Sequence, residues 1–239
     1  MAPVHIKAGK GDISSRVIAV GDPLRSTLIS SLLENARLVN DSRGLLAYTG
    51  KWKGELVTIA THGMGGPSAA IVFEELYMLG ASAIIRLGTA GSLKHDVDIG
   101  DVIVAASATS TCGGAGLSGY MDGRSVCLPN GPHPLLTSRV YGELTTRGFN
   151  PRLGLVVSSD SFYAEDSGFV DYWASKGALA VEMECATLFA LSWIRGFKSA
   201  CVLIVSNMVG GGEHLGTVEL RDRILSVSRV LMDVLVGMS

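Results

Sequence analysis

Short apolar runs alternate with helix-like stretches along almost the whole chain, and this alternation limits the fold more than any other feature of the sequence. Runs such as 16–20 and 55–61 are rich in Val, Ile, Leu and Ala, and glycine or polar residues follow them. They predict buried strands, and the stretches between them predict crossover helices. Because such crossovers are right-handed, we expect an α/β fold with a parallel or mixed sheet covered on both faces.

The element boundaries follow from this pattern and from capping residues. Asp22-Pro23 is a good helix start, since Asp caps well and Pro suits the first helical position. The predicted strands are 16–21, 55–62, 82–88, 101–106, 153–159, 178–183 and 200–206. The predicted helices are 22–33, 65–79, 133–147, 168–175, 184–194 and 217–236. We find neither a linker nor a repeat, so the chain is expected to be one domain, 1–239.

Charge and hydrophobicity exclude several classes of protein. The net charge is −2 without any basic run, which argues against nucleic acid binding. The apolar stretches are shorter than the roughly 20 residues of a membrane span, and the first residues lack the apolar core of a signal peptide, so we expect a cytoplasmic protein. Apolar residues make up 47% of the chain, which suits either an oligomer interface or a wide parallel sheet.

The four cysteines do not have the spacing of metal ligands, so no metal site is expected. Cys185 and Cys201 lie in apolar segments and are interpreted as small core residues. Cys112 and Cys127 flank a glycine-rich loop, where a disulfide within or between subunits is compatible with the sequence but cannot be derived from it.

Polar residues collect just after the predicted strands, where α/β folds bind their ligands. Arg25 and Arg86 stand beside glycine turns and helix starts, and Thr89 adds a hydroxyl near Gly88. Glycine lets backbone N–H groups approach an anion, and arginine offers paired donors shaped for phosphate. A phosphate pocket is therefore predicted. The motifs of nucleoside triphosphate and dinucleotide sites are absent from the sequence.

The stretch VEMECA (181–186) places two carboxylates, Glu182 and Glu184, in an apolar context. An unpartnered buried carboxylate is costly, so these groups need partners. The vicinal hydroxyls of a ribose would be suitable donors to them. Met64, Phe162 and Met183 could form apolar walls around a sugar or a flat base.

Together these residues resemble one family, the hexameric nucleoside phosphorylases, which act on purine nucleosides, methylthioadenosine or uridine. The resemblance covers nearly the whole chain. It rests on six motifs in the same order, namely GDPLR (21–25), THGMGGPS (61–68), RLGTAG (86–91), SSDSFY (158–163), VEMECAT (181–187) and VSN (205–207). It implies a mixed sheet bent toward a barrel and surrounded by helices, in a hexamer built from dimers. The implied reaction is reversible phosphorolysis, with orthophosphate as co-substrate and neither a metal nor an organic cofactor.

The resemblance also implies roles for individual residues. The phosphate-binding positions are Gly21, Arg25, Arg43, Arg86 and Thr89, with Arg43 lent by a neighbouring subunit. The ribose-binding positions are His5, Met64, Met183 and Glu184, with His5 lent across the dimer. The positions beside the base are Phe162, Glu182, Ser206 and Asn207. The catalytic positions are Asn207, Arg25 and Arg86.

One departure from the family concerns the base. In purine-specific members an aspartate that protonates the base usually stands at the position of Asn207, and an amide cannot act as an acid. Asn207 therefore fits inosine or guanosine better than adenosine. Uridine members carry a Gln-x-Arg pair downstream of SSDxFY, and residues 163–173 lack it. The purine or methylthioadenosine branch is favoured, with uridine phosphorylase as the alternative.

Blander interpretations apply to each residue taken singly. Asn207 alone would suit a turn, isolated arginines often lie solvated at the surface, and methionines usually belong to the core. A nucleosidase and a nucleoside-binding module are two further functional alternatives. Neither would use Arg25, Arg43 and Arg86 around one anion, and the presence of all three favours phosphorolysis.

Overall fold

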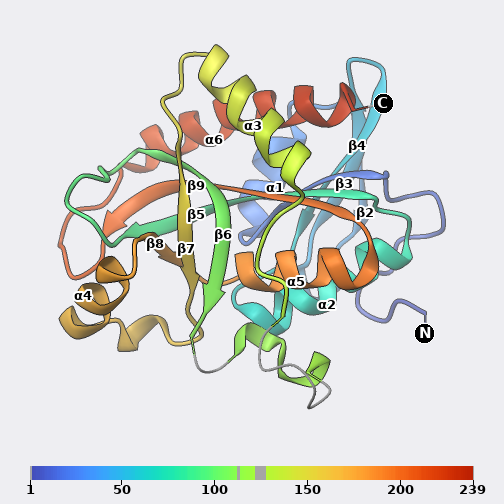
Figure 1. Ribbon diagram of the computed structural model, residues 1–239. Helices are drawn as coiled ribbons and strands as arrows, with labels where there is room; N and C mark the ends of the chain where they lie inside the picture. Colours follow the sequence, from blue (N-terminus) through green and yellow to red (C-terminus); the bar gives the residue numbers. More distant parts are fainter. Residues whose placement is uncertain (1, 112–113, 122–127, 239) are drawn as a thin grey trace.

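Nine strands form one continuous sheet at the centre of the protein, in a computed structural model that describes residues 2–111, 114–121 and 128–238 (Figure 1). The strands are β1 (Arg16–Val20), β2 (Glu34–Asn40), β3 (Ala47–Trp52), β4 (Glu55–Thr61), β5 (Ala83–Ser92), β6 (Val102–Ser110), β7 (Arg152–Ser158), β8 (Ala178–Glu182) and β9 (Lys198–Met208). The helices are α1 (Pro23–Ser30), α2 (Gly66–Met78), α3 (Pro134–Thr146), α4 (Ser167–Ser175), α5 (Cys185–Arg195) and α6 (Thr217–Val236). This single α/β domain confirms the expected fold class.

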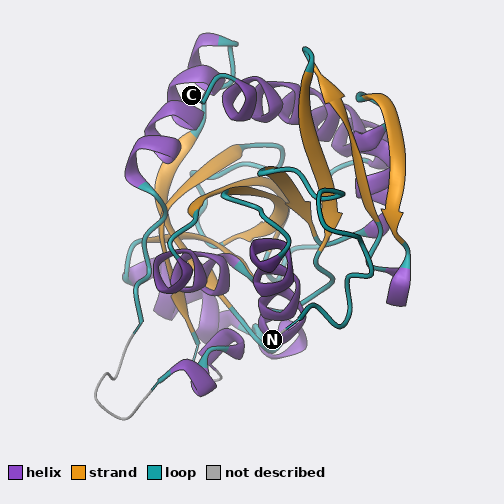
Figure 2. Ribbon diagram, turned by 90° about the vertical axis from the view of Figure 1, so that its right-hand side faces the viewer, coloured by secondary structure: helices purple, strands orange, loops and turns teal. Residues whose placement is uncertain are grey.

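The sheet closes on itself. Its order is β2-β3-β4-β1-β5-β8-β7-β6-β9, and β9 also pairs with β5 along nearly its whole length. The β5–β8 and β6–β9 pairs are antiparallel, while β1–β5, β5–β9, β6–β7 and β7–β8 are parallel. The mixed sheet is therefore bent into a barrel, as expected, and helices lie around its curved strands, while other strands reach the edge of the molecule (Figure 2).

Helices cover the sheet from both sides. In Figure 1, α3 and α6 lie on one side of the strands, and α2 and α5 lie on the opposite side. One core cluster includes Phe73 of α2 and Phe189 of α5, and a second includes Leu144 of α3 and Leu231 of α6. Among the described residues, no helix combines the length and the apolar character that crossing a bilayer would require.

Strands β2 and β3 lie between 34 and 54, where the local sequence pattern does not predict a strand. β2 is exposed over most of its length and so lacks an apolar stripe. β3 contains Gly50, whose position permits a close approach of β2. A Cβ there would lie 2.9 Å from the Cα of Ala36 and from the carbonyl oxygen of Glu34. The signals of both strands depend on their pairing, which the local pattern does not carry.

Three predicted boundaries were wrong in ways that affect the candidate site. Helix α1 ends at Ser30, not near 33, because tight turns at residues 31–33 lead into β2. Strand β5 continues past 88 to Ser92, and β9 continues past 206 to Met208. Thr89 and Asn207 are consequently strand residues, held by the long β5–β9 pairing.

The cysteine interpretation needs one correction. Cys185 and Cys201 are fully buried, as expected of core residues, but their sulfurs are also joined in a disulfide between the start of α5 and β9. Their Cα atoms lie 6.5 Å apart. The sequence separation hid the pairing because only the packing of α5 against β9 brings the two residues together. Cys112 and Cys127 lie outside the described residues.

Candidate functional site

A cavity of about 890 Å³ opens at the edge of the sheet where strands β1, β4, β5 and β9 end. Its volume falls in the range of small-molecule sites. Twelve of the thirteen site residues predicted from sequence line it, and His5 is the exception. They are Gly21, Arg25, Arg43, Met64, Arg86, Thr89, Phe162, Glu182, Met183, Glu184, Ser206 and Asn207.

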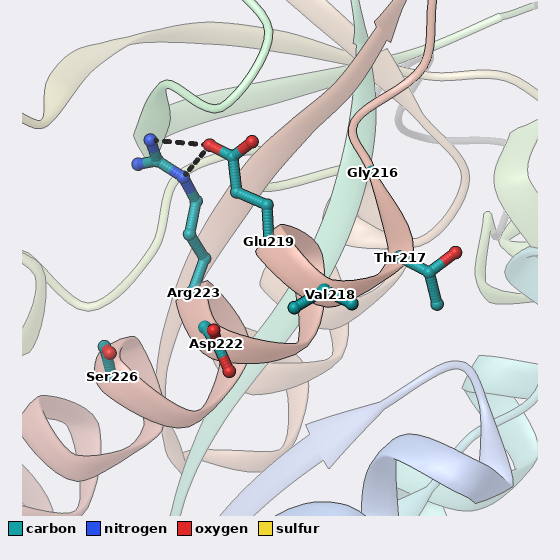
Figure 3. Close-up of a pocket in the computed structure, with 7 residues that line it drawn as sticks. All are labelled: Gly216, Thr217, Val218, Glu219, Asp222, Arg223 and Ser226. Atoms are coloured by element: carbon teal, nitrogen blue, oxygen red, sulfur yellow. Dashed lines mark hydrogen bonds and ion pairs between the residues drawn. The ribbon is translucent and has the colours of Figure 1, made fainter.

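A second hollow lies at the start of α6 and offers much less (Figure 3). All of its lining residues come from one stretch of chain, 216–226. Its charged pair, Glu219 and Arg223, is joined by hydrogen bonds of 3.2 and 3.3 Å, and both side chains are well exposed. The larger cavity is therefore the candidate site.

Positive charge gathers at one end of the cavity. Asp22 caps α1 by accepting the N–H of Leu24 at 2.8 Å, and this cap fixes the first helical turn, which carries Arg25. Arg25 Nη1 donates to Thr89 Oγ1 on β5 at 3.3 Å. Arg25 also lies 3.7 Å from the carboxylate of Asp22, a long contact that leaves most of its donors free. Burial lowers the pKa of Arg25, and the charge of Arg86 lowers it further against the attraction of Asp22.

Arg86 is buried and curls back over its own strand. A Cβ at Gly88 would lie 2.1 Å from its Nη1, so only glycine at this position leaves room for the guanidinium. Nη2 forms a very short ion pair with Glu184 and lies 3.3 Å from Glu182. Nε has no hydrogen-bond partner in the part of the chain that the structure describes. Arg86 thus joins the positive end of the cavity to a pair of carboxylates.

Glu184 is held as an ionised acceptor at the centre of the cavity. Its Oε1 accepts the N–H of Gly65 at 2.6 Å, and its Oε2 pairs with Arg86. Burial disfavours its charge, but Arg86 and the Gly65 N–H outweigh burial and hold the pKa of Glu184 below its ordinary value. A carboxylate has four lone-pair positions, so Glu184 can accept further hydrogen bonds from a ligand.

Glu182 is occupied by the protein itself. Its two oxygens accept the N–H groups of Glu184 at 2.8 Å and Cys185 at 3.0 Å, together with a short bond from the hydroxyl of Ser158. These bonds satisfy backbone donors at the start of α5. Burial raises the pKa of Glu182 against the attraction of Arg86, and the charge of Glu184 raises it further. Although it lines the cavity, its geometry is that of a group that positions Glu184.

Two large apolar side chains line the cavity and are also exposed to solvent. Met64 and Phe162 are 84% and 59% exposed. Asn207 lies on β9 beside Ser206, whose hydroxyl donates to its Oδ1 at 2.9 Å. The amide nitrogen of Asn207 donates weakly, at 3.3 Å, to the carbonyl of Met208. Asn207 pairs with Gly91, beyond Thr89 on β5, so the amide and the hydroxyl of Ser206 lie past the arginine end of the cavity and could bind a heterocyclic base there.

Two of the predicted residues have special positions. Arg43 lines the cavity of its own chain from a short 3₁₀ turn (Ser42–Gly44), where its φ is 58°, an uncommon value for a residue with a side chain. His5 lies elsewhere, with Nδ1 2.7 Å from Glu75 on α2. The N–H groups of Val4, His5 and Ile6 also bond to this carboxylate, so the segment around His5 is anchored.

Sequence reasoning missed several lining residues, including Glu165 and His214. Glu165 follows the 3₁₀ turn η4 (Phe162–Ala164), and burial raises its pKa against a hydrogen bond with Ser159. His214 lies in the loop after β9. Its signal was hidden because β9 was expected to stop at 206, before Asn207 could pair with the returning loop.

His62 is another missed residue, located behind Gly21 at the positive end of the cavity, where its Cε1 would lie 3.6 Å from a Cβ at Gly21. It is fully buried, both ring nitrogens lack hydrogen-bond partners among the described residues, and its ring packs on Phe73 at 5.4 Å. Burial lowers its pKa from 6.5 to about 4, with Glu184 and Arg86 acting in opposite directions. His62 is therefore neutral in the folded protein at neutral pH.

The low pKa of His62 predicts that the free energy of unfolding depends on pH under acidic conditions. Between pH 6.5 and about 4 the unfolded chain binds a proton at residue 62 and the folded chain does not, so the free energy of unfolding should fall as the pH falls through this window. The difference between the two pKa values corresponds to about 3 kcal/mol. Urea unfolding at several pH values measures it. The His62→Asn variant should lose this part of the slope, and an unchanged slope would contradict the prediction.

Comparisons with known proteins agree on one family. The family model described as the phosphorylase superfamily matches residues 15–235. A DeoD-type purine nucleoside phosphorylase from Caldanaerobacter subterraneus subsp. tengcongensis is 33% identical over 97% of this chain and 99% of its own length. Another from Geobacillus kaustophilus is 37% identical over 88% of each chain. The solved uridine phosphorylase of Vibrio fischeri superposes with a TM-score of 0.86 at 28% identity, covering 99% of this chain and 98% of that chain.

Proposed function

This chain belongs to the phosphorylase superfamily, and from that premise we propose that it is a pentosyltransferase that catalyses the reversible phosphorolysis of purine nucleosides. Phosphate attacks C1′ of the nucleoside, and the products are a free base and a ribose 1-phosphate. The expected substrates are inosine and guanosine, with methylthioadenosine next. The relatives named as purine nucleoside phosphorylases match nearly the full chain, and they support a purine nucleoside as the substrate.

The observation that carries the proposal is that three arginines and the carboxylate of Glu184 line the same cavity, with Arg86 in contact with Glu184. These arginines are Arg25, Arg86 and Arg43. A phosphate bound by the arginines would lie next to a ribose whose 2′ and 3′ hydroxyls donate to Glu184. Its nucleophilic oxygen would then face C1′, and holding two reactants in this way supplies much of the acceleration. Fixed positive charges also stabilise the charge that shifts between phosphate and sugar in the transition state.

Uridine phosphorolysis is the second candidate, and the likeness to a solved uridine phosphorylase is the observation that favours it. A nucleosidase is disfavoured because water needs no set of arginines as its binding site. The proposed chemistry uses orthophosphate as co-substrate and calls for neither a metal nor an organic cofactor. We assign it to purine salvage in the cytoplasm, where nucleosides and phosphate are both dissolved.

A substrate panel tests this proposal directly. Inosine, guanosine, adenosine, methylthioadenosine and uridine are each supplied with and without phosphate, and the free base and the pentose 1-phosphate are quantified. We expect the largest kcat/KM for a 6-oxopurine nucleoside and turnover only with phosphate. If the pentose 1-phosphate is absent with every nucleoside, phosphorolysis is excluded. Turnover without phosphate would indicate a nucleosidase.

The proposed assembly is a homohexamer, a trimer of dimers. The resemblance predicts that His5 and Arg43 are both shared between subunits. Because Arg43 lines the cavity of its own chain, we propose His5 as the group that a neighbour supplies. Sedimentation velocity should give a particle of six chains. The His5→Ala variant should keep that mass and lose affinity for the nucleoside, with a raised KM. A fully active monomer would exclude the shared site.

A further inference from the structure

The leaving base poses a chemical problem that the residues discussed so far do not solve. When the C1′–N9 bond of a purine nucleoside breaks, the bonding electron pair stays with the base. Departure is easier if a donor delivers a proton to N7 as the bond breaks. Asn207 occupies the base end of the cavity, and an amide is not an acid. A different group is needed to supply that proton, if the proposed function is correct.

Three ionisable groups line the cavity near that end besides Glu184, which is committed to Arg86. The oxygens of Glu182 already accept hydrogen bonds from the backbone at the start of α5 and from Ser158. Glu165 enters the lining from the segment just after the 3₁₀ turn that follows β7. His214 is exposed and enters the cavity lining from the loop after β9. Of the three, His214 is the one that pairs directly with Asn207.

The pairing fixes where the imidazole lies. Asn207 and His214 form an antiparallel bridge, and the N–H of Leu215 donates to the carbonyl of Ser206 at 2.7 Å. That bond flanks the pair, so Asn207 and His214 form a non-hydrogen-bonded pair, the type whose side chains lie closest. Side chains of such a pair share one face, with Cβ atoms roughly 5 Å apart. Because both residues line the cavity, this face is the one turned toward the base.

The loop between Asn207 and His214 contains the tight turn that lets the chain reverse direction. Residues 210–212 are glycines, and Gly210 has a φ of 77° in the tight turn, where Gly211 N–H donates to the Met208 carbonyl at 3.0 Å. The turn brings residue 214 back beside residue 207. The glycine run thus has a structural reason, which is to bring a histidine to the base side of the cavity.

We infer that His214 is a catalytic residue that protonates N7 of the departing purine, while Asn207 holds the 6-oxo group by hydrogen bonding. In this step a phosphate oxygen forms a bond to C1′, the C1′–N9 bond breaks, and its electron pair passes into the purine ring. The imidazolium of His214 transfers its proton to N7 and becomes neutral. Because His214 is exposed, solvent restores the proton for the next turnover. In this proposal two side chains share the role of a single acid, since the amide binds the base and the imidazolium protonates it.

The test compares two nucleosides that differ in their need for a proton. Inosine requires protonation of its leaving base. 7-Methylguanosine already carries a methyl group and a positive charge at that nitrogen, so its base leaves without protonation. In the His214→Gln variant, kcat/KM for inosine with phosphate should fall by about a hundredfold or more, the usual size of acid catalysis. For 7-methylguanosine with phosphate it should change by less than about threefold.

Several outcomes would overturn the assignment. Equal losses on both nucleosides would mean that His214 acts only through the shape of the loop, and an unchanged rate on inosine would mean that it has no role in catalysis. The matched control is His95→Gln, an exposed histidine outside the cavity, which should alter neither rate. If the parent cleaves neither purine nucleoside, the proposed function itself fails, which the parent shows before any variant is measured. If the parent is active and the variant behaves like it, only the role of His214 fails.

Discussion

Phosphate-dependent cleavage should almost disappear when Arg86 is replaced by alanine. Arg86 is buried at the junction between the positive end of the cavity and Glu184, so its charge acts in a site with little water. Loss of one such donor typically lowers kcat by about 10² to 10³, or about 3 to 4 kcal/mol in the transition state. The measurement is pentose 1-phosphate formation at increasing phosphate concentration, which separates kcat from the KM for phosphate.

Two further variants keep this prediction decisive. Arg86→Ala leaves Glu182 and Glu184 without their shared partner, and breaking a buried ion pair costs roughly 3 to 5 kcal/mol of stability. Arg25→Ala avoids this problem, because the ion-pair contact of Arg25 is the long one to Asp22, and it should raise the KM for phosphate. The control is Arg229→Ala, an exposed arginine of α6. Unchanged phosphate dependence in folded Arg86→Ala and in Arg25→Ala would place the anion elsewhere.

Replacing Glu184 by glutamine should remove the preference for ribose. The carboxylate is the acceptor proposed for both sugar hydroxyls, and a hydrogen bond to a charged group contributes about 1.5 to 3 kcal/mol. We expect kcat/KM for inosine to fall by at least about a hundredfold. The value for 2′,3′-dideoxyinosine should change little. The measurement is the ratio of the two kcat/KM values in the parent and in the variant.

The role of Glu184 in ribose binding can be tested against an exposed carboxylate as control. Glu34→Gln changes an exposed carboxylate on β2 that does not line the cavity, and it should leave the ratio as in the parent. The parent should already discriminate strongly between the two nucleosides. If the parent cleaves both at equal rates, Glu184 does not bind the hydroxyls. A variant that keeps the parent's ratio would assign Glu184 to holding Arg86 alone.

Part of the site could be predicted from local patterns, and the resemblance to the nucleoside phosphorylases supplied further positions such as Arg43 and Ser206. Arg25 follows a capped helix start, and Arg86 lies in an apolar run that leads to glycine. Glu184 stands among apolar residues, where a carboxylate has to have a partner. Each of these signals spans only a few residues, and twelve of the thirteen predicted positions do line one cavity.

The rest depended on how the elements pair and pack in the folded chain. Glu182 looked like a base contact, but the start of α5 uses its oxygens. The disulfide between Cys185 and Cys201 requires α5 to pack on β9. The place of His214 requires β9 to run on through Asn207 and then accept the returning loop. A one-residue change of register in β9 would turn Cys201 and Asn207 to the other face of the sheet, and register is set by pairing between strands.

The sequence by itself therefore determined the alternation of strands and helices, the fold class, and the kinds of chemical group at the strand ends. Local hydrophobic periodicity, capping and glycine placement are enough for these, since they act over a few neighbouring residues. Only the tertiary structure decided that the sheet closes through β5 and β9, that Arg86 pairs with Glu184, and that a histidine lies beside Asn207. Closure of the sheet pairs residues far apart in sequence, such as Arg86 and Cys201, which are 115 positions apart, and no local pattern encodes such a pairing.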